Sequence, residues 1–255
     1  MKFLSALLCS ILFLSITEAS DKSREEYLAL IKQYPHLIAP MGESVKGEIE
    51  IITDPEKMAA IEKAQNRDVG VVWRDKYWIW INDACRFPKG NEGIYARILW
   101  VKALTSNPGV AVMPVLPDGR IVLNCNFRHA TRTWEFELPR GIINPNETPE
   151  AAAQREALEE TGMQVDYLEK LGDLPPDTGV ITSIIPVFRA QVIKQQKSQQ
   201  DETEAIEDII ALSRKEIKEA FAQGYYLYKI RGKEQKVFFR DPFLAYAFLL
   251  TDEKK

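Results

Sequence analysis

This chain of 255 residues has few histidines and cysteines, and it has no excess of positive charge. With 2 histidines and 3 cysteines, the chain has too few of these ligands for a histidine-rich zinc site. The formal net charge of -4 gives no broad basic field, which argues against nucleic acid as a partner. The 45% hydrophobic and 27% charged content is ordinary, and it predicts a globular protein with a sizeable core.

Long apolar runs are absent after the first residues of the chain. Residues 1–19 have a basic start at Lys2, an apolar stretch, and the small residues Thr17 and Ala19 before Ser20. The apolar stretch is shorter than the ~20 residues of a spanning helix, so we expect a cleaved signal peptide rather than an uncleaved membrane anchor. The expectation is an exported protein, periplasmic or secreted, with no stable membrane insertion after cleavage.

Cysteine chemistry is also limited after such a cleavage, because only Cys85 and Cys125 remain. Export would permit a disulfide between them. Their spacing fits no metal-binding motif, and two buried small side chains are the simpler expectation.

Repeats and serine- or glycine-rich linkers are absent as well, whereas helix and strand patterns alternate along the chain. The expected helices cover residues 23–32, 55–65, 149–161, 213–224 and 241–252. The expected strands cover 47–52, 69–73, 77–81, 95–101, 109–116, 120–127, 134–141 and 184–193, with a polar loop over 194–208. This order predicts an α/β fold in which helices cover a mixed β-sheet. We expect residues 20–105 to be an N-terminal extension of helices and a β-hairpin, packed on a core formed by residues 106–255.

One stretch, "GIINPNETPEAAAQREALEETGM" from Gly141 to Met163, carries five glutamates. Thr148 is a suitable N-cap, Pro149 fits the first turn, and Gly162 can close the helix. The helix is therefore well specified by local signals at both ends.

Three of these glutamates, Glu156, Glu159 and Glu160, share one helix face. Like charges at this spacing repel, and Arg155 is the only cation in the segment. Hard divalent cations such as Mg²⁺ or Mn²⁺ prefer carboxylate oxygens, so they would neutralise the cluster. Mg²⁺ often binds through carboxylates together with substrate phosphates, so a cation here would indicate phosphoanhydride chemistry. For the glutamates alone, a solvated acidic helix face is the alternative.

The whole stretch resembles the Nudix box, in which glycine, acidic and arginine positions recur at fixed spacing. The matching residues are Gly141, Glu147, Arg155, Glu156, Ala157, Glu159, Glu160, Gly162 and Met163. The resemblance implies a Nudix-type α/β/α sandwich with a mixed β-sheet and, in this chain, an N-terminal extension. It also implies hydrolysis of a nucleoside diphosphate linked to another group, with Mg²⁺ or Mn²⁺ as cofactor.

Carried over by position, the resemblance assigns roles to the residues of the box. Glu156 and Glu160 look like the principal metal ligands, and Glu159 a further ligand or a base that orients water. The Gly141 carbonyl is a further metal ligand, or the glycine serves only the turn. Arg155 would pair with Glu147, and Gly162 would have a structural role.

The flanks are similar to the ADP-ribose pyrophosphatase branch of the family, in "NFRHATRTWEFELPRG" before the box and "LGDLPPDTGVITSIIPVFRA" after it. This implies substrate binding by Arg128 and a site-facing carboxylate at Glu137, although each is also explained as a surface charge. The acidic loop would supply Glu202 or Glu204 as catalytic base. Asn126 and Thr178 depart from the branch's pattern, which leaves the exact substrate open.

The function expected from these observations is a metal-dependent pyrophosphohydrolase acting on ADP-ribose or a nucleotide-sugar, with release of a nucleoside monophosphate and a sugar phosphate. Dinucleoside polyphosphates or nicotinamide dinucleotides are the alternative substrates, and a non-catalytic nucleotide-binding protein is the alternative class. The branch often forms homodimers, and the apolar "YWIWI" run at residues 77–81 would suit either a dimer contact or a buried hairpin in a monomer.

Overall fold

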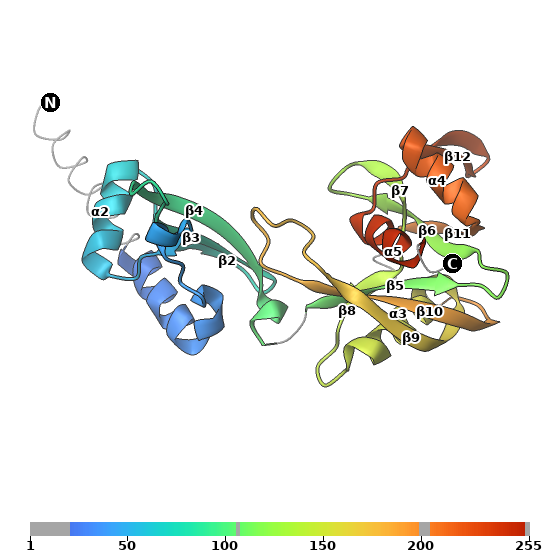
Figure 1. Cartoon of the computed structure of the whole chain (residues 1–255), viewed down its shortest axis with the longest axis horizontal. Coiled ribbons are helices and arrows are strands. Elements are labelled where there is room, and N and C mark those ends of the chain that lie inside the picture. The colour runs from blue at the N-terminus through green and yellow to red at the C-terminus, as the bar shows by residue number, and fades with distance from the viewer. Residues whose placement is uncertain (1–20, 106–107, 199–204, 253–255) are drawn as a thin grey trace, which may run out of the picture. The chain divides into compact units, whose positions relative to one another are not determined.

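The computed structural model describes residues 21–105, 108–198 and 205–252. The predicted signal peptide and the loop glutamates Glu202 and Glu204 lie outside the described residues. The chain divides into two compact units, one formed by Met1–Ser106 and Asp177–Ser183 and the other by Asn107–Pro176 and Ile184–Lys255 (Figure 1). In the described part of the chain, every helix is too short or too polar to cross a membrane. The packing of the N-terminal extension on the rest stays a prediction.

The first unit combines short helices with an antiparallel sheet (Figure 1). Its elements are a helix over 21–33, η1 (Pro35–Ile38), η2 (Ser44–Lys46), β1 (Glu50–Ile51), α2 (Pro55–Gln65), β2 (Gly70–Arg74), β3 (Trp78–Arg86), β4 (Glu92–Trp100) and η3 (Val101–Leu104). The sheet runs β1-β3-β2, and β4 pairs with β3. The strand predicted over 47–52 is reduced to β1, because Gly47 takes a left-handed conformation (φ 88°) that ends the preceding turn.

One face of this sheet forms the core of the first unit. Ile79 and Ile81 of β3 are fully buried there against Tyr27 and Met58 from the helices. The Tyr27 hydroxyl donates to Asp83 Oδ1 at 2.6 Å, and Arg97 pairs with the same carboxylate at 2.5 Å. The buried Asp83 is thus paired with a cation of the neighbouring strand, and its bond to Tyr27 holds the first helix on the sheet.

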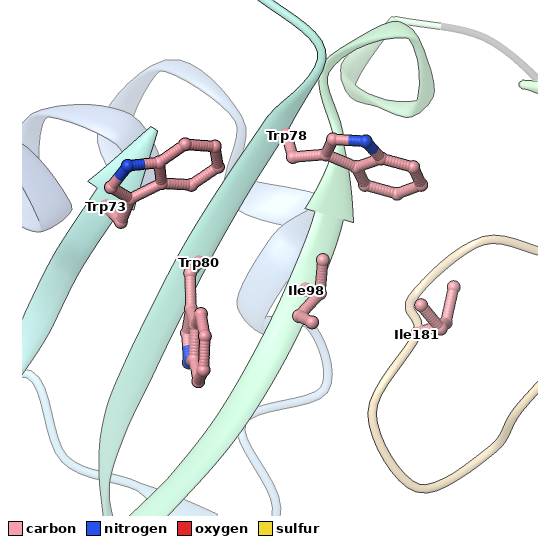
Figure 2. Close-up of a pocket in the computed structure, with 5 residues that line it drawn as sticks. All are labelled: Trp73, Trp78, Trp80, Ile98 and Ile181. Carbon is pink, nitrogen blue, oxygen red and sulfur yellow. The ribbon is translucent and has the colours of Figure 1, made fainter. Parts of the chain in front are cut away.

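The other face carries a row of tryptophans that remains exposed (Figure 2). In the strand register Trp73 lies opposite Trp80, Trp80 opposite Ile98, and Ile98 opposite Ile181. Together with Trp78 these residues line an apolar pocket of about 290 Å³. Because side chains alternate along a strand, the same run that buries Ile79 presents Trp78 and Trp80 to solvent. The apolar run is therefore one-sided, not a hairpin buried on both faces.

Ile181, which lies at the end of this row of paired residues, comes from a distant part of the chain. Residues 177–183 lie along β4, where the Ile98 amide donates to the Val180 carbonyl at 2.9 Å and the Thr182 amide to the Ile98 carbonyl at 3.3 Å. The Tyr95 hydroxyl adds a bond to the Gly179 carbonyl at 2.8 Å. The sequence pattern gave no indication of this pairing.

The second unit contains a mixed sheet of nine strands with helices on both faces. Its elements are β5 (Gly109–Val115), β6 (Ile121–Arg128), β7 (Thr133–Glu137), β8 (Arg140–Ile142), α3 (Pro149–Thr161), β9 (Met163–Leu174), β10 (Ile185–Gln195), β11 (Ile206–Leu212), α4 (Arg214–Gln223), β12 (Tyr225–Ile230), β13 (Lys233–Phe238) and α5 (Pro242–Asp252). The sheet order is β12-β13-β7-β6-β5-β10-β9, with β11 on β6 and β8 on β5. The β10/β5 and β13/β7 pairs are parallel, so the predicted mixed sheet is confirmed.

Alternation along β5 shows how the two faces are covered. Val110 and Val112 pack with the alanines of α3, whereas Ala111 and Met113 pack on the side of α4 and α5. This is the predicted α/β/α sandwich. On β7, Phe136 is fully buried in the α5-side core, and Trp134 packs against the same cluster.

Some strands of this unit differ from the sequence-based expectation, since β11 begins inside the polar loop predicted over 194–208. The hairpin β12–β13 is not predicted by the helix and strand patterns. Its turn is formed by Arg231 and Gly232, both left-handed (φ 47° and 81°), the conformation that two-residue hairpin turns favour. Cys85 of the first unit and Cys125 of the second are both free and buried, so the simpler expectation of two buried small side chains is confirmed, and burial raises the pKa of each thiol to about 12.

Candidate functional site

The helix α3 runs from Pro149 to Thr161, as its local signals predict. The Thr148 side chain accepts a hydrogen bond from the Ala151 amide at 3.2 Å, and Gly162 ends the helix in a left-handed conformation (φ 71°). Its alanines pack on the sheet, and this fixes which way the glutamates of the helix point.

Two of the three predicted glutamates are buried beside one short strand, β8. Glu156 and Glu160 are 6% and 5% exposed. A Cβ added to Gly141 would lie 2.1 Å from Glu156 Oε1, so only glycine leaves room for this carboxylate. One residue earlier, the Arg140 amide donates to Glu160 Oε2 at 3.3 Å. Neighbouring residues of β8 therefore receive both carboxylates.

A second contact to Glu160 comes from Asn124 on β6, which the sequence patterns did not single out. Its side-chain amide donates to Glu160 Oε2. Asn124 is 2% exposed, and its Oδ1 has no hydrogen-bond partner among the described residues. A buried asparagine in the otherwise apolar run "IVLNC" is the signal by which it could have been found.

Arg155 joins the box loop to the helix. Its guanidinium donates to both Glu147 oxygens, at 2.8 and 2.9 Å, and to the Ile142 carbonyl at 2.7 Å. These bonds hold the pKa of the Glu147 carboxyl below its usual range. Arg155 Nη1 also reaches Glu156 Oε1 at 2.7 Å and Glu159 Oε2 at 2.8 Å. Part of the acidic cluster is thus neutralised by Arg155 itself.

The structure separates Glu159 from the other two acids of the helix. Its side chain is 42% exposed, whereas those of Glu156 and Glu160 lie inside. Within the residues that the structure describes, no group of three or more acidic, histidine or cysteine side chains is arranged to hold a metal ion. The three carboxylates do not form a single cradle.

A divalent cation nevertheless fits the donor set at β8. Mg²⁺ usually binds through one or two carboxylates and completes its shell with waters and substrate phosphates. Glu156 and Glu160 supply two buried carboxylates, and the buried Asn124 Oδ1, which has no hydrogen-bond partner among the described residues, is a further oxygen donor beside Glu160. The residues that would hold the cation are therefore Glu156 and Glu160.

The predicted substrate residues Arg128 and Glu137 are paired with each other. Arg128 Nε donates to Glu137 Oε2 at 2.6 Å, and Arg140 Nη2 donates to Glu137 Oε1 at 2.7 Å. Burial raises the pKa of Glu137 although both arginines oppose this. The Arg128 side chain is 38% exposed, so Glu137 holds a cation whose other side faces solvent.

Comparisons with known proteins agree with this fold. Residues 105–229 match the model of the NUDIX domain, so the chain carries a Nudix domain. A crystal structure of an ADP compounds hydrolase shares the fold, with a TM-score of 0.50 and 22% identity, over 60% of this chain and 79% of that one.

Curated relatives are similar over part of their length. The ADP-ribose pyrophosphatase of Bacillus subtilis is 32% identical over 109 residues, 42% of this chain and 59% of the relative. A GDP-mannose pyrophosphatase of Yersinia enterocolitica is 36% identical over 100 residues, 36% of this chain and 52% of the relative. The chain thus spans somewhat over half the length of these relatives.

Proposed function

We propose that the chain is a metal-dependent pyrophosphohydrolase. It would cleave ADP-ribose or a nucleotide-sugar to a nucleoside monophosphate and a sugar phosphate. The observation that carries the proposal is the pair of buried carboxylates, Glu156 and Glu160, received by neighbouring residues of β8 within a Nudix domain. Burying two carboxylates one helical turn apart is unfavourable unless cations compensate their charge, and, within the described residues, Arg155 reaches only Glu156 of the two.

The residues of the site divide the work. A bound Mg²⁺ or Mn²⁺ would activate water and polarise the phosphate. Glu156 and Glu160 hold that cation, and Arg155 fixes Glu156 and the box loop in place. The exposed guanidinium of Arg128 binds substrate phosphate while Glu137 orients it. The proton of the attacking water passes to Glu159 or to a glutamate of the acidic loop, Glu202 or Glu204.

The substrate class rests on the named activities of the relatives. One of them acts on ADP-ribose and another on GDP-mannose, and both substrates contain a nucleoside diphosphate joined to a sugar. We therefore place the specificity of this chain among nucleoside diphosphates linked to a sugar.

A direct test uses the mature protein with Mg²⁺ or Mn²⁺ and a panel of ADP-ribose, GDP-mannose, diadenosine polyphosphate and nicotinamide dinucleotide, with products separated by chromatography. Glu160→Gln should lower turnover about 10³-fold or more, because metal activation supplies several kcal/mol. Glu150→Gln, at an exposed position in the first turn of the same helix, should leave turnover unchanged. Tight nucleotide binding without turnover in the unaltered protein would instead identify a nucleotide-binding protein.

We also propose that the chain is exported through residues 1–19. The support is the basic, apolar and small-residue order of this segment. N-terminal sequencing of the natural protein should begin at Ser20, and a sequence that starts at Met1 would contradict export by cleavage.

We further propose a homodimer that uses the tryptophan row of the first unit. Trp73 and Trp80 are 53% and 43% exposed, and contiguous exposed apolar side chains usually mark an interaction surface. A row on one sheet face can pair with its own copy about a two-fold axis. Sedimentation should show a dimer that Trp80→Ser converts to monomer, and a monomeric unaltered protein would exclude it.

A further inference from the structure

The last helix, α5, begins at a buried aspartate whose contacts extend well beyond the helix. Asp241 is 3% exposed, and its carboxylate accepts from the amides of Phe243 and Leu244, each at 3.3 Å, as an N-cap does. The same carboxylate accepts from the Leu138 amide at 3.0 Å and from Arg140 Nη1 at 2.8 Å. A cap needs only the first two bonds, so the other two serve Leu138, which lies between β7 and β8, and Arg140, which begins β8.

Arg140 connects this aspartate to the substrate side of the site. Its guanidinium joins Asp241 through Nη1 and Glu137 through Nη2, and it lies over the Phe243 ring at 5.1 Å. The planar fork of an arginine can hold two carboxylates at once, which a lysine ammonium does poorly. Because a buried carboxylate without a partner is strongly unfavourable, Asp241 and Arg140 fix each other's position.

The backbone of Arg140 carries this constraint to the acidic helix. The Arg140 amide donates to Glu160 Oε2, and the next residue, Gly141, lies against Glu156. Strand β8 has only three residues, and each pairs with one residue of β5. A strand this short depends on its side-chain anchors, and Arg140 is anchored by Asp241.

We propose that Asp241 is a positioning residue for the Glu160 carboxylate, acting through Arg140 and the backbone of β8. The C-terminal helix is then part of the site, although Asp241 and Arg140 are 101 positions apart in the chain. The inference rests on the proposed function, since it concerns how Glu160 is placed to receive a divalent cation.

Calorimetric titration of the full mature protein with Mn²⁺, in the absence of nucleotide, tests the inference. Asp241→Asn and Arg140→Lys should each raise the Mn²⁺ dissociation constant about tenfold to a hundredfold, the usual effect of removing a partner that orients a metal ligand. Arg140→Lys retains the charge and the Asp241 cap, so it carries the test if Asp241→Asn does not fold.

Ser213→Ala is the matched control, because Ser213 caps α4 in the same unit and its bonds are to Glu216. It should lower the melting temperature by about 2–4 °C and leave Mn²⁺ affinity unchanged. If Asp241→Asn likewise lowered the melting temperature and left Mn²⁺ affinity unchanged, Asp241 would have a purely structural role, and the inference would be overturned.

Coupling gives a second readout. If Asp241 acts through Arg140, the variant that combines Asp241→Asn and Arg140→Lys should bind Mn²⁺ as tightly as the single variant with the lower Mn²⁺ affinity. In these variants the kcat of hydrolysis should fall, whereas KM should change little. Fully additive losses in Mn²⁺ affinity would overturn the inference while leaving the hydrolase proposal intact. Failure of the unaltered protein to bind Mn²⁺ would instead overturn both.

Discussion

The two units of the chain place charged and aromatic side chains in opposite ways. Among the described residues, the second unit buries five carboxylates, those of Glu135, Glu137, Glu156, Glu160 and Asp241, whereas the first unit buries only Asp83. Several of the phenylalanines and tryptophans reverse this pattern. Phe136, Phe188 and Phe239 are buried in the second unit, whereas Trp73, Trp78 and Trp80 are exposed in the first.

This difference matches the roles that we propose for the two units, chemistry in the second and contact with a partner in the first. Buried carboxylates are unfavourable unless they are paired or receive a cation, so their concentration in the second unit supports the proposed site there. Exposed tryptophans do not stabilise an isolated sheet face, but they provide large contact areas to a partner. The following predictions test the distinction.

The largest expected effect comes from filling the space beside Glu156. Gly141→Ala should lower turnover about 10³-fold (~4 kcal/mol), because the new methyl group displaces a carboxylate that holds the cation. Turnover assays with Mg²⁺ and ADP-ribose measure the loss. Gly179→Ala is the control, since its Cβ would meet only Asp177 Oδ1 at 3.2 Å. Near-normal activity of Gly141→Ala would mean that Glu156 does not hold the cation.

Adjacent residues of β3 should differ sharply in their effect on stability. Ile79→Ala removes a fully buried side chain and should reduce the free energy of unfolding by about 2–5 kcal/mol. Trp80→Ala, on the exposed face, should change the free energy of unfolding of a monomeric sample by only about 0.5 kcal/mol. Urea denaturation at low protein concentration measures both. Equal losses would mean that the tryptophan row belongs to the core.

Arg155→Lys should have an intermediate effect on activity. Lysine retains the charge but cannot reach Glu147, Glu156 and Glu159 together, so turnover should fall about tenfold to a hundredfold. Arg189→Lys provides a matched control in the same unit, because its ion pair with Glu169 is long, at 3.8 Å. If the two variants were equally active, Arg155 would have no positioning role.

The smallest effect concerns acid stability. The Arg155 hydrogen bonds lower the pKa of Glu147 below its ordinary 4.5, so its stabilisation is complete above pH 4.5 and is lost as the pH falls through the lowered pKa. Glu147→Gln should therefore be less stable by about 0.5–1 kcal/mol at pH 6. Denaturation from pH 3 to 7 measures the free energies of unfolding of Glu147→Gln and of the unaltered protein, and the two values should converge at the acidic end. A constant difference across this range would contradict the assignment.

Local signals explain why much of the candidate site was predictable from the sequence. Thr148, Pro149 and Gly162 determine both ends of α3 within a few residues of chain, and helical spacing then places the glutamates on one face. Spacing alone, however, did not separate Glu159 from Glu156 and Glu160. That separation depends on how α3 packs on the sheet and on the reach of Arg155.

Contacts between distant residues explain what the sequence could not provide. Asn124 meets Glu160 from 36 positions away, and Asp241 meets Leu138 from 103 positions away. No periodicity or cap in either segment points to its partner. The same limit applies to residues 177–183, whose turn-like composition says nothing of the strand edge beside which they lie.

The placement of residues 177–183 also determines how this protein can be divided. The chain passes from one unit to the other at 106–107, 176–177 and 183–184, so the first unit is assembled from two separate pieces of the polypeptide. Deleting residues 20–106 would leave the second piece without the β4 edge that receives its backbone hydrogen bonds. The first unit therefore cannot be removed, exchanged between proteins or expressed alone as one continuous block.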